Sequence, residues 1–166
     1  MDMKYDIKSK LDAAFEKHEA SERTAAEVQQ DRESKEQVFL REFIQVRKSV
    51  VRPAMEEIGE YVEGKGYSYD ISTEDDRPSP HGRGRSTPAS ITLTILLGGE
   101  RRYPLHEHPG LSVICDKDKQ KVRFHETVRS PGRGGHSGPA GEVELSDLTS
   151  DFVQEKILNV VAQVFR

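Results

Sequence analysis

The chain contains neither glycine nor proline between Met1 and Arg52. The residues in this stretch are mostly Glu, Lys, Ala, Gln, Arg and Asp, and most of these are well tolerated in helices. Because nothing interrupts a helix here, the sequence predicts one long N-terminal helix. Proline lacks a backbone N–H, so we predict a kink or a new helix start near Pro53, and an end at Gly64 and Gly66.

The apolar pattern divides this helical stretch in two. Ile7, Leu11 and Phe15 form a thin stripe, which fades through the polar residues that follow. From Val38 onward apolar residues are dense at helical spacing, as expected of a core helix. We therefore predict a charged helical extension over residues 1–36 and an α+β domain over residues 37–166. Because this extension is highly charged and has few apolar residues, two alternatives stay open: it is ordered in the isolated chain, or it folds only when it binds a partner.

Alternation of apolar and polar residues predicts the strands. Residues rich in β-branched and aromatic types occupy four segments: Tyr67–Thr73, Ala89–Leu97, Leu111–Cys115 and Lys121–Val128. A further strand is predicted over 101–107 after a turn at Gly98 and Gly99, and a short edge strand over 142–145. Stretches rich in glycine, proline and arginine predict exposed loops over 74–88 and 129–141.

The last segment, Thr149 to Arg166, starts at a helix cap and carries apolar residues at helical spacing. The order of helix, four to five consecutive strands and helix predicts a two-layer α+β fold, with an antiparallel sheet and both core helices on one face. In the clearest hairpin, alternation places five residues on the buried face: Leu111, Val113, Cys115, Val122 and Phe124. Arg123 and His125 are expected on the opposite face.

Composition limits the classes of function. The formal net charge of −4 provides no overall attraction to nucleic acid or acidic membranes, so an anion site has to be local. Cys115 is the only cysteine, which rules out a disulfide within the chain and fits a reducing compartment. We find no signal-peptide pattern and no apolar run of membrane-spanning length. We therefore expect a cytoplasmic protein that does not enter membranes and needs no cofactor.

Three histidines form one candidate site. His106 and His108 are in an H-x-H pattern on the predicted strand 101–107 and its continuation, and His125 is on a neighbouring strand. Three imidazoles on one face of a sheet can bind one metal ion. The alternative is that these histidines simply face solvent.

Arginines in the two predicted loops form a second candidate site: Arg83, Arg85, Arg129 and Arg133. Guanidinium groups donate two parallel hydrogen bonds to phosphate, so these loops could bind a polyanion such as nucleic acid. Their spacing matches no phosphate-binding motif. The alternative is that the loops are solvated connectors.

We predict no catalytic residue, because Cys115 alternates into the apolar face, and Ser79 and Ser137, although close to histidines in the sequence, are in predicted loops without a rigid frame. The leading hypothesis is a non-enzymatic interaction or assembly protein. In it Ile7, Leu11 and Phe15 mediate association with a second copy or with another protein. The heptad pattern of the N-terminal helix is too short and too often interrupted by polar residues to indicate a coiled coil. Polyanion binding and a metal-dependent enzyme are the alternatives.

Overall fold

The computed structural model describes residues 4–82, 84, 86–97 and 103–165. The chain divides into two compact units, residues 1–38 and 39–166, which are described here separately. Among the described residues no helix is both long enough and apolar enough to span a membrane.

The first unit consists of the N-terminal part of helix α1, which runs over Tyr5–Val46. Every residue from 4 to 35 is exposed. Side chains one helical turn apart form ion pairs, including Asp6 with Lys10 at 3.4 Å and Asp31 with Lys35 at 3.2 Å. Such pairs each add a few tenths of a kcal/mol, about 0.2–0.5, to a helix. The long N-terminal helix is confirmed.

The second unit begins where α1 becomes apolar. A short π-helical segment, Arg47–Val51, joins α1 to helix α2, Arg52–Gly64. Pro53 lies in the first turn of α2, and the backbone stays helical through the junction, with Arg52 N–H donating to Arg47 O. The kink or new helix start predicted near Pro53 therefore corresponds to a π-helical segment within one continuous helical stretch. Gly66, with φ of 94°, ends the helix because the left-handed conformation suits glycine.

The sheet is a five-stranded antiparallel meander in which each strand pairs with the next along the chain. Its strands are β1 Ser68–Glu74, β2 Ser90–Leu96, β3 Gly110–Asp116, β4 Lys121–Ser130 and β5 Gly134–Val143. The register aligns apolar residues across strands, with Ile91 opposite Val113 and Val113 opposite Phe124. All five residues predicted to share the buried face are buried.

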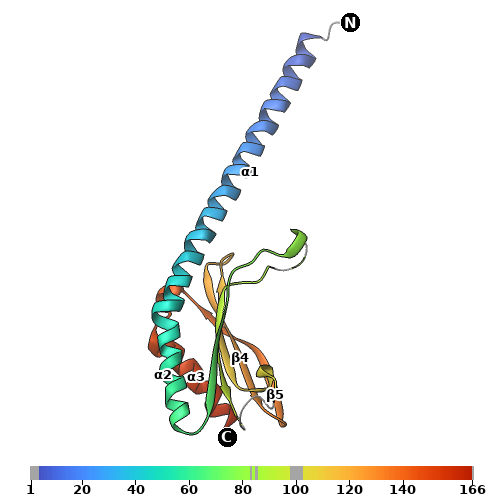
Figure 1. Cartoon of the computed structure of the whole chain (residues 1–166). Coiled ribbons are helices and arrows are strands. Elements are labelled where there is room, and N and C mark those ends of the chain that lie inside the picture. Colours follow the sequence, from blue (N-terminus) through green and yellow to red (C-terminus); the bar gives the residue numbers. More distant parts are fainter. Residues whose placement is uncertain (1–3, 83, 85, 98–102, 166) are drawn as a thin grey trace. The chain divides into compact units, whose positions relative to one another are not determined.

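Helices cover one face of this sheet (Figure 1). Helix α2 packs on β1 and β2, and helix α3, Ser150–Val164, packs on β3 and β4. Thr149 caps α3 by accepting a hydrogen bond from the backbone N–H of Phe152. The end of α1 adds Phe39 and Phe43 to the same core. The two-layer α+β fold predicted from the sequence is therefore confirmed.

One predicted strand is wrong. In the described part of 101–107, Leu105–Glu107 forms a single 3₁₀ turn, closed by a hydrogen bond from Glu107 N–H to Pro104 O at 3.0 Å. Proline has a fixed φ and no N–H, so Pro104 favours the start of a turn over a place in a strand ladder. The predicted turn at Gly98 and Gly99 lies outside the described residues.

The predicted loop over 129–141 is also wrong, because β4 and β5 form a long hairpin there. Arg133 N–H donates to Ser130 O at 3.0 Å, and Gly132 has φ of 75°. With Pro131 in the second position, this is a type II turn, which favours proline followed by glycine. The glycines therefore shape the hairpin instead of preventing it. The last strand, β5, does lie at an edge of the sheet, as predicted, but covers Gly134–Val143 instead of residues 142–145.

Arg47 ties the helical layer to the ends of two strands. Its guanidinium donates to the carbonyl oxygens of Glu74 at 2.9 Å and Ser90 at 3.2 Å, and to the carboxylate of Asp75 at 3.3 Å. The Arg47 side chain is only 13% exposed. Hydrogen bonds from a charged donor in such a place are stronger than those between neutral groups.

We expect Arg47→Ala to lower the free energy of unfolding by about 1–2 kcal/mol, because two carbonyl oxygens lose a charged donor. Chemical denaturation followed by circular dichroism measures this change. Arg52→Ala is the control, since the described side-chain contact of Arg52 is an exposed ion pair with Glu56 at 3.7 Å. Its replacement should change stability by less than about 0.5 kcal/mol. Equal effects in the two variants would contradict a specific role for Arg47.

Candidate functional site

The predicted association residues lie on an exposed surface of α1. Ile7, Leu11 and Phe15 are 48%, 42% and 62% exposed. Their spacing of four places them on one side of the helix, one turn apart. We call these three residues the apolar stripe. An exposed apolar stripe on a helix of polar residues is typical of a surface that another chain covers.

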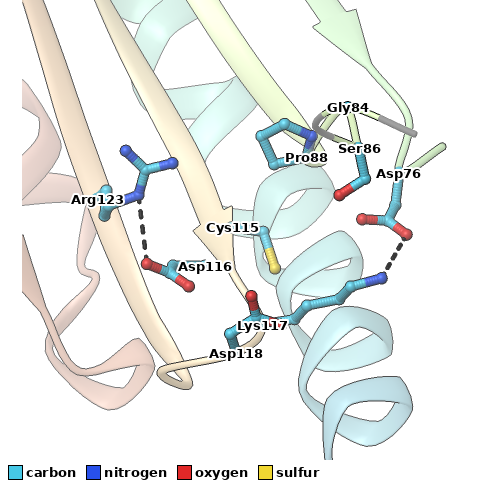
Figure 2. A pocket seen from close by; sticks show the side chains of 9 residues that line it. All are labelled: Asp76, Gly84, Ser86, Pro88, Cys115, Asp116, Lys117, Asp118 and Arg123. Carbon is cyan, nitrogen blue, oxygen red and sulfur yellow. Dashed lines mark hydrogen bonds and ion pairs between the residues drawn. The ribbon is translucent and has the colours of Figure 1, made fainter. Parts of the chain in front are cut away.

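A second feature of the molecule is a pocket of about 400 Å³ in the sheet unit. Figure 2 shows its lining. One wall comes from the connection between β1 and β2, with Asp76 and Ser86 among its residues, and the other from the end of β3 and the turn after it. Cys115, the last residue but one of β3, is part of the second wall and lines the pocket.

Two ion pairs lie among the residues that line the pocket, and one of them joins its two walls. Lys117 Nζ lies 2.9 Å from an oxygen of Asp76, and Arg123 Nε lies 3.4 Å from an oxygen of Asp116 (Figure 2). The first pair links residues 41 positions apart in the sequence, and both of its side chains are mostly shielded from solvent. The Asp76–Lys117 pair holds the long β1–β2 connection against the β3–β4 turn, whereas the Asp116–Arg123 pair lies within the β3–β4 hairpin. Both carboxylates are already engaged in ion pairs.

The thiol in this pocket is not activated. Burial, with a further contribution from the Asp76 carboxylate, raises the pKa of Cys115 to about 12. A nucleophilic cysteine needs the opposite, a lowered pKa that yields thiolate at neutral pH. The pocket therefore lacks the chemistry of a cysteine enzyme.

We expect Cys115 in the folded protein to react with iodoacetamide at pH 8 at least about a hundredfold more slowly than in the unfolded chain, because the thiolate fraction is so low. The free energy of unfolding should also fall between about pH 9 and 12. In this pH range the unfolded chain releases the proton of the Cys115 thiol, whereas the folded chain retains it. The stabilising contribution of the protonated thiol is therefore fully present below about pH 9 and is lost as the pH rises toward 12. Mass spectrometry of the alkylated protein measures the rate. Equal rates would contradict this burial.

The three candidate metal ligands lie in different settings. His106 is exposed, whereas His108 is 1% exposed and its Nδ1 accepts a hydrogen bond from Leu97 N–H at 3.0 Å. His125 lies on β4 opposite Ser112. In the described part of the chain, no three His, Cys, Asp or Glu side chains are arranged to bind one metal ion. The reason is the 3₁₀ turn, which breaks the strand that was expected to present His106 and His108 together.

The candidate anion-binding arginines are only partly placed. Arg129 lies near the end of β4 and Arg133 in the turn to β5, so both belong to one hairpin end. Arg83 and Arg85 lie outside the described residues. Polyanion binding by the four arginines thus stays a prediction.

Sequence reasoning missed the residues that build the pocket. The Asp76–Lys117 pair follows no local pattern, since its two residues are 41 positions apart in the sequence. The only local signal was Cys115, whose place on the buried face was predicted. Comparisons with protein families, with curated proteins and with solved structures gave no match.

Proposed function

We propose that this chain is a non-enzymatic interaction or assembly protein that associates through the N-terminal part of α1. The observation that carries the proposal is the apolar stripe, whose three side chains remain between 42% and 62% exposed. The surrounding residues from 4 to 35 are exposed and mostly polar, so they leave the stripe uncovered.

Energetics favour covering the stripe. Full burial of one large apolar side chain is worth about 1.5–3 kcal/mol relative to exposure, and the three side chains are each about half exposed. Covering all three against another helix provides a few kcal/mol toward association. The partner would also stabilise the helix itself, because a helix gains most of its stability from packing of its apolar face.

The experiment is a measurement of particle mass by size exclusion with light scattering over a range of concentrations. Leu11→Glu is expected to weaken association at least about tenfold, or about 1.4 kcal/mol, because a charge replaces a covered apolar side chain. For the isolated chain this appears as a lower mass at a given concentration. If the partner is another protein, the same loss is measured on binding to that protein.

Ala13→Glu is the matched control. It introduces the same charge only two residues away, but two residues turn the helix by about 200°, so the added carboxylate points away from the stripe. The control variant is expected to associate like the unchanged chain. Equal weakening by both variants would mean that added charge alone, not the apolar stripe, is responsible, and the proposal would be wrong.

A further inference from the structure

A longer pattern extends through the exposed part of α1. Six positions follow one another at alternating spacings of three and four, the spacing of seam positions where two helices pack side by side. All six are exposed. We call them the seam: Leu11, Ala14, His18, Ser21, Ala25 and Val28.

The seam has the same order of side-chain types in both directions. From either end it begins with a large apolar residue, continues with an alanine and reaches a polar residue at its centre. A second helix running in the opposite direction would therefore place Leu11 against the partner's Val28. It would also place Ala14 against the partner's Ala25, so that layers of matching size face each other.

Charged residues next to the seam and beyond its ends also favour antiparallel pairing. Arg32 continues the seam spacing, and in a parallel pair it would face its own copy, which like charges oppose. In an antiparallel pair Arg32 faces the partner's Ile7 instead, and its aliphatic stem can pack on that side chain. Lys35 gives no preference, because it would face its own copy in a parallel pair and the partner's Lys4 in an antiparallel one.

The flanking positions add opposite charges. Lys10 precedes the first seam residue, and in an antiparallel pair it approaches the partner's Asp31. The twofold symmetry of the pair gives two such contacts. Both side chains are mostly exposed and now form ion pairs within their own helix, with Asp6 and Lys35. Contact between copies would join these pairs into one network. Exposed pairs contribute little energy, but they set the direction of pairing.

We propose that the partner of this helix is a second copy of the same chain, packed antiparallel along the seam, with a twofold axis passing between His18 and Ser21. This inference rests on the proposed function and adds to it the identity of the partner and the direction of pairing. Such an interface uses the same surface on both copies, as a closed twofold dimer requires.

The test uses cysteine variants of the full chain and a short bis-maleimide that spans less than about 10 Å. In an antiparallel pair Ala14 faces the partner's Ala25 but lies about 16 Å along the helix from the partner's Ala14. A mixture of Ala14→Cys and Ala25→Cys chains should therefore form a cross-linked dimer, whereas neither variant alone should. The unchanged chain is the control for Cys115, which is buried.

Each outcome decides between the two proposals. Cross-linking of the mixture alone, in a chain whose mass is that of a dimer, supports the antiparallel pair. A dimeric chain in which single variants cross-link, or in which no combination does, overturns the seam and its direction but leaves association through α1 standing. A chain that is monomeric at every concentration overturns pairing with itself. Only equal association of the Leu11→Glu and Ala13→Glu variants, with themselves or with a partner protein, would overturn the proposed function as well.

Discussion

Replacing Phe43 by alanine is expected to lower the free energy of unfolding by about 3–5 kcal/mol. Phe43 lies near the end of α1, is 0% exposed, and belongs to the core cluster that also contains Val51 and Met55. Alanine would leave a cavity between the helices and the sheet, since a close-packed core relaxes only partly around a missing ring. Chemical denaturation followed by circular dichroism measures the loss.

Ile44→Ala is the matched control, because Ile44 is the next residue of the same helix but is 38% exposed. Its replacement removes little buried surface, and we expect a loss of less than about 1 kcal/mol. The comparison tests whether the end of α1 is part of the core. Similar small losses in both variants would show that α1 does not pack on the sheet unit at Phe43.

The parts of the fold that follow from local periodicity could be predicted. The β3–β4 hairpin and its buried face follow from strict alternation, and helix α3 follows from its cap at Thr149 and from apolar residues at helical spacing. Both patterns reflect burial on one side of an element, so each can be recognised within a single segment of sequence.

The errors arose where glycine and proline have more than one use. Pro104 begins a 3₁₀ turn in a segment with strand-like alternation, and Gly132 completes a tight turn in a segment that we expected to be a loop. The sequence shows that the backbone is unusual at such residues but does not show which conformation it adopts. The expectation that His106 and His108 lie on one strand followed from the first of these errors.

The apolar stripe could be predicted from the sequence, whereas the pocket could not, because only the stripe is formed by residues close together in the sequence. The apolar stripe is local, since Ile7, Leu11 and Phe15 are one turn apart on one helix. The pocket depends on pairing between distant segments, as the Asp76–Lys117 contact illustrates. The pattern of apolar residues within a single strand or helix cannot predict such a contact. The Asp76 and Lys117 side chains come together only through the pairing register of the whole sheet.

Gly135 is expected to be among the most sensitive positions of the β4–β5 hairpin. It pairs with Arg129 and has φ of 141°, a conformation that other residues rarely adopt. A Cβ atom there would lie only 2.1 Å from Val128 O. We therefore expect Gly135→Ala to lower the free energy of unfolding by about 2–4 kcal/mol through backbone strain and overcrowding. Thermal and chemical denaturation measure the global effect, and amide exchange in β5 measures the local one.

Gly138→Ala provides the control from the same strand. A Cβ atom at Gly138 meets nothing within 4 Å, so the change in stability should stay within about 0.5 kcal/mol. If both variants were equally stable, the hairpin could not have the close pairing at Gly135. A large loss at Gly135 alone would show that this glycine is required by the close approach of two strands, and that the glycine-rich sequence from Gly134 to Gly141 encodes an edge strand.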